Sequence, residues 1–233
     1  MSEDVRELVS RGSRVLGAAG LDDYIWGHVS VRDPEGRGAW LKRAGIGLSE
    51  VLAADVQLVS PEGEVIEGAG ERHIEYPIHT EVLAARPDVA AVVHIHPPHA
   101  VALAAAGVAL RPFSHAGSLF TPPAMPVFDA TSDLIRSREL GQSVASSLGD
   151  RNAVFLLNHG IVTVGPDLPT AVFTAMLLEE ACEQQLRTVG YGGEARWTSD
   201  AEALEKRERI YSPRAIRNVW EHLTKRLEAE ARP

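Results

Sequence analysis

The amino-acid sequence predicts an α/β protein whose first half contains an antiparallel sheet, and three patterns support this fold class. Residues 56–60 and 63–66 flank the turn residues Pro61-Glu62, which is typical of a β-hairpin. Residues 89–93 are a short, apolar, β-branched run, and Pro97-Pro98 prevents a strand there from continuing. The last third of the chain has apolar residues at helical spacing.

Composition limits the class of protein and its partners. The chain has 233 residues, 45% hydrophobic and 24% charged, as in soluble globular proteins. We expect one domain over residues 1–233, with a helical C-terminal segment from about residue 199. The formal net charge of −9 disfavours a nucleic-acid partner, because binding phosphates requires a basic face.

Compartment is indicated by what the sequence contains at its start and by its cysteine usage. The single cysteine, Cys182, excludes an internal disulfide and suits a reducing compartment. The chain shows neither a basic region followed by an apolar one at its start nor an apolar run of about 18 residues. We therefore expect a cytoplasmic protein with no membrane partner.

Helices in the first half are indicated by apolar residues three or four apart between residues that start and stop helices. Ser2 can cap the first helix and Gly20 ends it. Pro77 is tolerated in the first turn of a later helix, and Pro87 closes it. The helices predicted here are residues 2–20, 71–86 and 97–107.

Strands in the first half are indicated by alternation between turn residues. Polar side chains alternate with Val29 and Val31, so residues 25–32 predict a strand, followed by a turn at residues 33–36. Residues 40–42 predict a short partner strand.

The second half combines a long loop, a hairpin and helices. Four prolines predict a loop over residues 110–130, in which His115 fits ordinary polar surface. Buried strands predicted at residues 153–157 and 161–164 flank Asn158-His159-Gly160, which places His159 at a hairpin tip. The helices predicted here are residues 140–149, 171–189 and 213–230.

The histidines at strand ends predict a metal site. His94 and His96 lie two residues apart on one strand face, roughly 6.6 Å along the chain, and could converge on one ion. The alternative, in which one faces the core and the other faces solvent, conflicts with strand alternation. His159 adds a third imidazole at a strand end. Three such histidines favour a common metal site.

Other polar residues have weaker patterns. Glu75 and His79 lie four residues apart on one predicted helix face, where they fit a site or an exposed pair. His28 and Ser30 share a strand face, which fits a site or a solvated surface equally well. The glycine-rich loop over residues 43–47 can bring backbone N–H groups close to a ligand.

Five motifs in this order resemble the class II aldolase/adducin family, over the chain from about Leu8 to Leu186. The specific ones are the paired histidines and Asn-His-Gly, and the others support them. The motifs are Gly27-His28-Val29-Ser30-Val31-Arg32, Glu75 with His79, Arg86-Pro87-Asp88, Val93-His94-Ile95-His96 and Asn158-His159-Gly160. The resemblance implies a three-layer α/β/α domain around a mostly antiparallel sheet. It also implies a homo-oligomer, often a tetramer, with sites at subunit interfaces.

The resemblance further implies one divalent metal ion per chain and a set of catalytic residues. His94, His96 and His159 correspond to the family's metal ligands, and Glu75 to its acid/base residue. These ligands suit zinc first, then manganese or another transition metal. The loop tyrosine that assists proton transfer in the family is missing near His115. Tyr211 in the C-terminal segment is taken as the second catalytic candidate.

Departures from the sugar-phosphate aldolases of the family indicate an unphosphorylated substrate. His73-Ile74 stands where small hydroxyl residues would meet a phosphate, and Arg43-Ala44-Gly45 replaces a hydroxyl-and-glycine loop. The variants around His28 and His115 resemble the branch that contains decarboxylases of aromatic hydroxy-dicarboxylates. The candidate substrate-binding residues are His28, Ser30, Arg43, Gly45, His73, His79 and His115.

We therefore expect a metal-dependent carbon–carbon lyase acting on a small hydroxy-carboxylate, with decarboxylation ahead of aldol cleavage of a hydroxy-keto acid or sugar phosphate. One alternative is a sugar-phosphate dehydratase, which needs a phosphate cradle that the sequence lacks. Another is a non-catalytic, adducin-like scaffold, which has no physical need for three metal ligands and Glu75.

Overall fold

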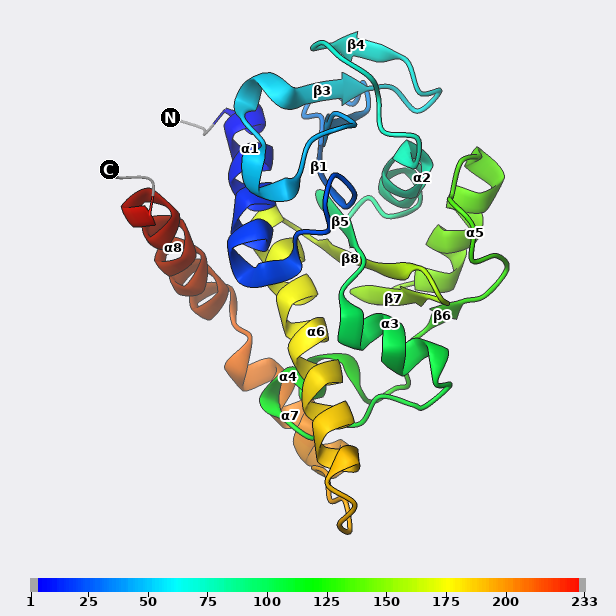
Figure 1. Cartoon of the computed structure of the whole chain (residues 1–233), viewed down its shortest axis with the longest axis vertical. Coiled ribbons are helices and arrows are strands. Elements are labelled where there is room, and N and C mark those ends of the chain that lie inside the picture. The colour runs from blue at the N-terminus through cyan, green and yellow to red at the C-terminus, as the bar shows by residue number, and fades with distance from the viewer. Residues whose placement is uncertain (1–3, 231–233) are drawn as a thin grey trace.

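The computed structural model describes residues 4–230, and an eight-stranded sheet forms the centre of this part of the chain (Figure 1). The strands are β1 (His28–Arg32), β2 (Ala39–Lys42), β3 (Val56–Val59), β4 (Val65–Glu67), β5 (Ala91–Ile95), β6 (Val127–Phe128), β7 (Ala153–Leu156) and β8 (Gly160–Gly165). Their order in the sheet is β4-β3-β2-β1-β5-β8-β7-β6. All neighbouring pairs are antiparallel except β6 and β7, so the predicted antiparallel sheet is confirmed.

Helices cover both faces of the sheet and give the predicted three-layer α/β/α architecture. The helices are α1 (Val5–Leu16), α2 (Tyr76–Ala85), α3 (Pro98–Ala105), α4 (His115–Phe120), α5 (Arg138–Leu148), α6 (Leu168–Gly190), α7 (Asp200–Ile210) and α8 (Pro213–Glu230), with short helical turns at Gly17–Leu21, Leu48–Glu50 and Ala53–Asp55. On one face, α2 packs against α5. On the other, α1 and α3 pack against α6, and α8 runs beside α1 and α6 (Figure 1).

Alternation along β5 decides which side chains reach which layer. Val93 and Ile95 face the α6 side in one core cluster, whereas Val92 faces the α2 side in another. His94 has the same parity as Val92 and therefore lies on the α2 side. His28 of β1 is paired with His94 in the sheet register and lies on the same side. The sheet face that packs against α2 therefore carries the polar side chains of His28 and His94 within an otherwise apolar core.

Two elements near the N-terminus begin later than predicted, for local reasons. The side chain of Asp4 caps α1 by accepting a hydrogen bond from the backbone N–H of Arg6 at 3.0 Å, and Ser2 lies outside the described residues. Strand β1 begins at His28 rather than at residue 25, because Gly27 has φ of +69° and interrupts the extended backbone.

Two further predictions of secondary structure are corrected. Helix α2 begins at Tyr76, so Glu75 is the residue before the helix and not a member of one helix face with His79. Helix α4 forms inside the segment predicted as a loop. There, the hydroxyl oxygen of Ser114 accepts a hydrogen bond from the backbone N–H of Gly117 at 3.2 Å, and Phe120 is buried in the α6-side core.

Asp33, at the end of β1, holds the turn between β1 and β2. Its carboxylate accepts hydrogen bonds from the Arg37 guanidinium and from the Trp40 indole N–H, each at 2.9 Å. The side chain of Asp33 is buried, and the bonds from Arg37 lower its pKa from 3.8 to about 2. This carboxylate therefore stabilises the fold only where it is ionised.

Asp33→Asn is expected to lower the free energy of unfolding by about 2 kcal/mol at pH 7. The folded-state pKa of Asp33 is depressed, so its stabilisation is complete above the unfolded pKa, about 4, and is lost as the pH falls through about 2. Urea unfolding of both proteins between about pH 3 and pH 7 measures the difference. If the difference in free energy of unfolding between the two proteins stays the same as the pH is lowered, the role given to the Asp33 carboxylate is contradicted.

The helices in the described part of the chain do not meet the requirements of a membrane span. None of them combines the necessary length and apolar character.

Candidate metal centre and active site

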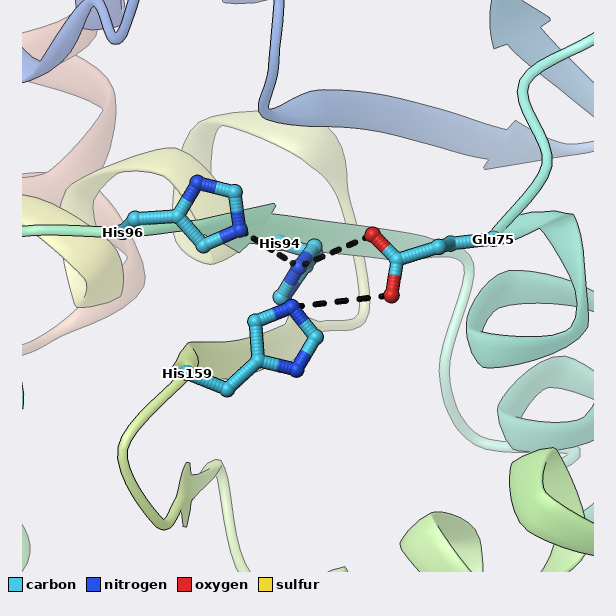
Figure 2. Close-up of side chains that lie close together, drawn as sticks. All are labelled: Glu75, His94, His96 and His159. Atoms are coloured by element: carbon cyan, nitrogen blue, oxygen red, sulfur yellow. Dashed lines mark hydrogen bonds and ion pairs between the residues drawn. The ribbon is translucent and has the colours of Figure 1, made fainter. Parts of the chain in front are cut away.

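Three histidines meet at one end of the central strands (Figure 2). His94 lies in β5, His96 follows that strand, and His159 lies in the turn between β7 and β8. The Nε2 atoms of His94 and His96 are 3.1 Å apart. A nitrogen from each of the three rings and a carboxylate oxygen of Glu75 lie within 4.8 Å of one another. The structure therefore brings the three predicted ligands together with the predicted acid/base residue.

Hydrogen bonds on the far side of two rings determine which nitrogen faces the site. Nδ1 of His94 lies 2.9 Å from the carbonyl oxygen of Ile161, and Nδ1 of His96 lies 2.9 Å from a carboxylate oxygen of Asp23. Both partners accept, so both Nδ1 atoms carry the hydrogen and donate. With the hydrogen placed on Nδ1, the Nε2 atom of each ring presents its lone pair to the other. A bound cation is what makes such a close approach of two lone pairs favourable.

His159 completes this donor set. Both of its ring nitrogens are buried and have no hydrogen-bond partner among the described residues. Burial lowers the pKa of His159 to about 4 and the pKa of His94 well below its usual value, so both rings are neutral at pH 7. These two neutral imidazoles, together with Nε2 of His96, form a set of three nitrogen donors that fits a divalent metal ion.

The Asn-His-Gly motif is explained by close packing at this turn. Asn158 has φ of +56°, a left-handed conformation that asparagine tolerates better than most residues. A Cβ atom on Gly160 would lie 2.5 Å from the carbonyl oxygen of Ile95 and 2.8 Å from the ring of His96. Glycine is therefore needed for His159 to approach the paired histidines.

Glu75 faces the three histidines from the segment that leads into α2. Its Oε1 accepts a hydrogen bond from the backbone N–H of Ile135 at 2.8 Å and lies 3.5 Å from Nε2 of His159. Its Oε2 lies 3.8 Å from Nε2 of His94. The side chain is 2% exposed, and burial raises the pKa of its carboxyl group. One oxygen is thus held by the backbone, while the other is free to exchange a proton.

A buried chain of hydrogen bonds runs from β1 to the other side of Glu75. Ser30 Oγ lies 2.6 Å from Nδ1 of His79, and Nε2 of His79 lies 2.5 Å from Nδ1 of His28. Nε2 of His28 has no hydrogen-bond partner among the described residues and lies 3.9 Å from Oε2 of Glu75. The ring of His73 packs 3.8 Å from that of His28, between centroids. Of the predicted substrate-binding residues, His28 and His73 therefore adjoin Glu75, and His79 and Ser30 lie behind His28.

The two loop candidates, Arg43 and Gly45, lie in different surroundings. The guanidinium of Arg43 donates to the carboxylate of Asp55 at 2.7 Å. Gly45 has φ of +76° and lines the same pocket as Glu75. The loop reaches the site through Gly45, whereas Arg43 already has an acidic partner.

His115 and Tyr211 do not join this cluster within the chain. Exposed His115 begins α4, which packs on α6, and the ring of Tyr211 lies 6.4 Å from that of Phe173, between centroids. Burial raises the pKa of Tyr211 to about 12. Both residues lie on the α6 side of the sheet, while the histidines lie on the α2 side. Their roles at a site stay predictions.

A pocket of about 340 Å³ opens beside Glu75, a size that suits a ligand with a single ring. Its walls include Trp26, Arg72, His73 and Leu134.

Sequence reasoning missed two residues of this site. Arg72 lines the pocket, and its position next to His73 was the signal that could have identified it. Asp23 holds His96, but 73 positions separate them, and no pattern in the sequence connects the two. A buried cation, Lys42, donates to the carbonyl oxygens of Ile25 and Ile46 and so joins two loops beside the pocket.

Comparison with known proteins places this geometry in a family. The family described as Class II Aldolase and Adducin N-terminal domain matches residues 7–186. The 3,4-dihydroxyphthalate decarboxylase of Arthrobacter keyseri is 32% identical, with 96% of this chain and 94% of the relative covered. The enzyme of that name from Terrabacter sp. (strain DBF63) is 35% identical, with 81% of this chain and 82% of the relative covered.

Among solved structures, L-fuculose 1-phosphate aldolase from Glaciozyma antarctica PI12 has the same fold. It superposes with a TM-score of 0.83 at 25% identity, covering 97% of this chain and 88% of that protein. The resemblance inferred from the sequence motifs is thereby confirmed. The chain belongs to the class II aldolase and adducin family.

Proposed function

We propose that the protein is a divalent-metal-dependent carbon–carbon lyase that decarboxylates an unphosphorylated aromatic hydroxy-dicarboxylate. The observation that carries this proposal is the set of three imidazoles beside Glu75, with two of the rings fixed so that Nε2 faces the site. The names of relatives aligned over most of the chain support the substrate class.

His94, His96 and His159 would hold the ion, and zinc suits three imidazoles best, with manganese or another transition metal next. When bound, the ion stabilises the negative charge left on a hydroxy-aromatic ring after a carbon–carbon bond breaks. His94 and His96 keep their orientation through Ile161 and Asp23.

Glu75 would deliver the proton that replaces the lost carboxylate on the ring. Its Oε1 is held by the backbone N–H of Ile135, so Oε2 is the oxygen that carries and releases the proton. The pocket beside Glu75 gives the substrate ring a place next to this oxygen. Burial raises the pKa of Glu75, which favours the protonated form needed for this step.

Aldol cleavage is the second candidate, because it needs the same charge stabilisation and the same proton transfer. The structural likeness to an L-fuculose 1-phosphate aldolase favours it. Ile74 and Ala44, whose side chains have no donor, line the pocket where a phosphate would require several, which favours an unphosphorylated substrate. A sugar-phosphate dehydratase would also need several donors for the phosphate. A non-catalytic scaffold would have no need for the three histidines of the metal site. We also propose a homotetramer acting on a small molecule.

The metal-loaded protein is expected to release carbon dioxide from 3,4-dihydroxyphthalate and little aldehyde from ketose phosphates. A side-by-side assay offers this acid, a hydroxy-keto acid and a ketose phosphate, and measures carbon dioxide and aldehyde. Efficient aldehyde release from the ketose phosphate, with no carbon dioxide from any acid, would overturn the proposed function in favour of aldol cleavage.

A further inference from the structure

Arg72 has an unusual environment for a cation beside a pocket. Its guanidinium carbon lies 4.1 Å from the centroid of the Tyr76 ring, which it covers. Its Nη1 is buried and has no hydrogen-bond partner among the described residues. The side chain also lines the pocket that contains Glu75. A guanidinium nitrogen in this state has donors available for an anion.

The other cations near the pocket already have partners. Lys42 donates to two backbone carbonyl oxygens, and Arg43 donates to the carboxylate of Asp55. Arg136, two residues after Leu134 of the pocket wall, donates to the carboxylate of Asp133 at 2.9 Å. Arg72 therefore differs from all three, because its Nη1 atom has no acceptor within residues 4–230.

His73 provides a second unpaired donor position next to Arg72. Its Nδ1 is buried and has no hydrogen-bond partner in the described part of the chain. A neutral imidazole can carry its hydrogen on this atom and donate it. The rigid fork of a guanidinium, together with one further donor, matches the planar shape and single charge of a carboxylate.

We propose that Arg72, assisted by His73, binds the carboxylate that the aromatic substrate keeps after decarboxylation. This inference rests on the proposed function. A dihydroxyphthalate has two adjacent carboxylates, and the proposed reaction removes the one beside a hydroxyl group that binds the metal and keeps the other. The retained carboxylate then needs a partner near Glu75, and the pocket offers Arg72 there. Stacking on Tyr76 holds the guanidinium in place before the ligand arrives.

Binding of two unreactive ligands tests this subsite without relying on turnover. 3,4-Dihydroxybenzoate has both hydroxyl groups and the retained carboxylate, whereas catechol has the hydroxyl groups alone. In calorimetric titrations of the metal-loaded protein, the carboxylate is expected to tighten binding. Arg72→Gln is expected to reduce this advantage by about 10- to 100-fold, with the Kd for catechol unchanged. Arg72→Lys keeps the positive charge but loses the two parallel donors of the guanidinium. This variant is expected to lose only part of the gain in affinity that the carboxylate gives.

Arg6 supplies a matched control, because it also stacks on an aromatic ring, that of Trp40, at 4.8 Å and is paired with Glu67. Arg6→Gln is expected to keep the full carboxylate advantage. The inference is overturned if the wild type binds 3,4-dihydroxybenzoate no more tightly than catechol. It is also overturned if Arg72→Gln keeps the tighter binding of the carboxylate, or if Arg43→Gln loses it while Arg72→Gln does not. It is also overturned if inorganic phosphate competes through Arg72 more tightly than the carboxylate does.

Failure of the proposed function has a different signature. In that case the protein releases no carbon dioxide from 3,4-dihydroxyphthalate, while the advantage that depends on Arg72 is still measured in the titrations. The subsite is then supported, and the reaction must be another one on a carboxylate-bearing ligand.

Discussion

Glu75→Gln is expected to retain the fold and the bound metal while turnover falls by at least about 10²-fold. The glutamine oxygen can keep the hydrogen bond from the Ile135 backbone N–H, now 2.8 Å long, so the side chain keeps its position. The variant loses the titratable oxygen, because an amide neither accepts nor releases the proton in this pH range. The measurement is the rate of carbon dioxide release at saturating 3,4-dihydroxyphthalate, with metal content determined on the same samples.

Glu81→Gln is the matched control for this variant. Glu81 is also a buried glutamate, lies on α2, and binds Arg138 and Gln142 instead of the histidines. Its substitution is expected to reduce stability but to leave turnover near that of the wild type. Near-normal turnover in Glu75→Gln would remove Glu75 from the mechanism. Equal losses in both variants would attribute the effect to disturbance of α2.

Much of the site could be predicted because it depends on short-range geometry. His94 and His96 lie two positions apart at the end of a strand, and strand alternation alone places both rings on one face. The position of His159 at a hairpin tip could be predicted because the turn residues Asn158 and Gly160 flank it between two apolar strands. The hairpins β1–β2, β3–β4 and β7–β8 could be predicted for the same reason, whereas β5 pairs with β1 and β8, which are far from it in the sequence.

Other parts of the site depend on long-range packing that no spacing in the sequence reveals. Glu75 reaches the histidines because α2 packs across the face that carries His28 and His94. The role of Arg43 in substrate binding stays a prediction, and the pairing of β2 with β3 places Asp55 against its guanidinium, which no spacing reveals. Four prolines predicted a loop in the segment that contains α4. The helix forms there because Ser114 caps it and Phe120 is buried in the core, and the sequence does not show that burial.

The purified protein is expected to carry about one divalent ion per chain, and His94→Ala is expected to lose it. His94 is fully buried in the ligand set, with its Nε2 atom 3.1 Å from Nε2 of His96, and lies on β5, which pairs with β8 after His159. Removing its imidazole leaves two ligands, too few for tight binding in a site where three are needed. Elemental analysis of both proteins measures the ion. Chelation of the wild type should abolish turnover, and return of zinc or manganese should restore it.

Two further variants grade the effect and separate metal binding from folding. Asp23→Asn keeps all three ligands but weakens the hydrogen bond that orients His96, so metal affinity should fall by about 10- to 100-fold, less than in His94→Ala. His222→Ala removes an exposed histidine of α8 and should leave the metal content unchanged. Equal metal content in wild type and His94→Ala would rule out this site. An equal loss of metal in Asp23→Asn and His222→Ala would indicate a general loss of stability and not loss of the site. The reason is that Asp23 contacts a metal ligand, His96, whereas His222 lies on α8.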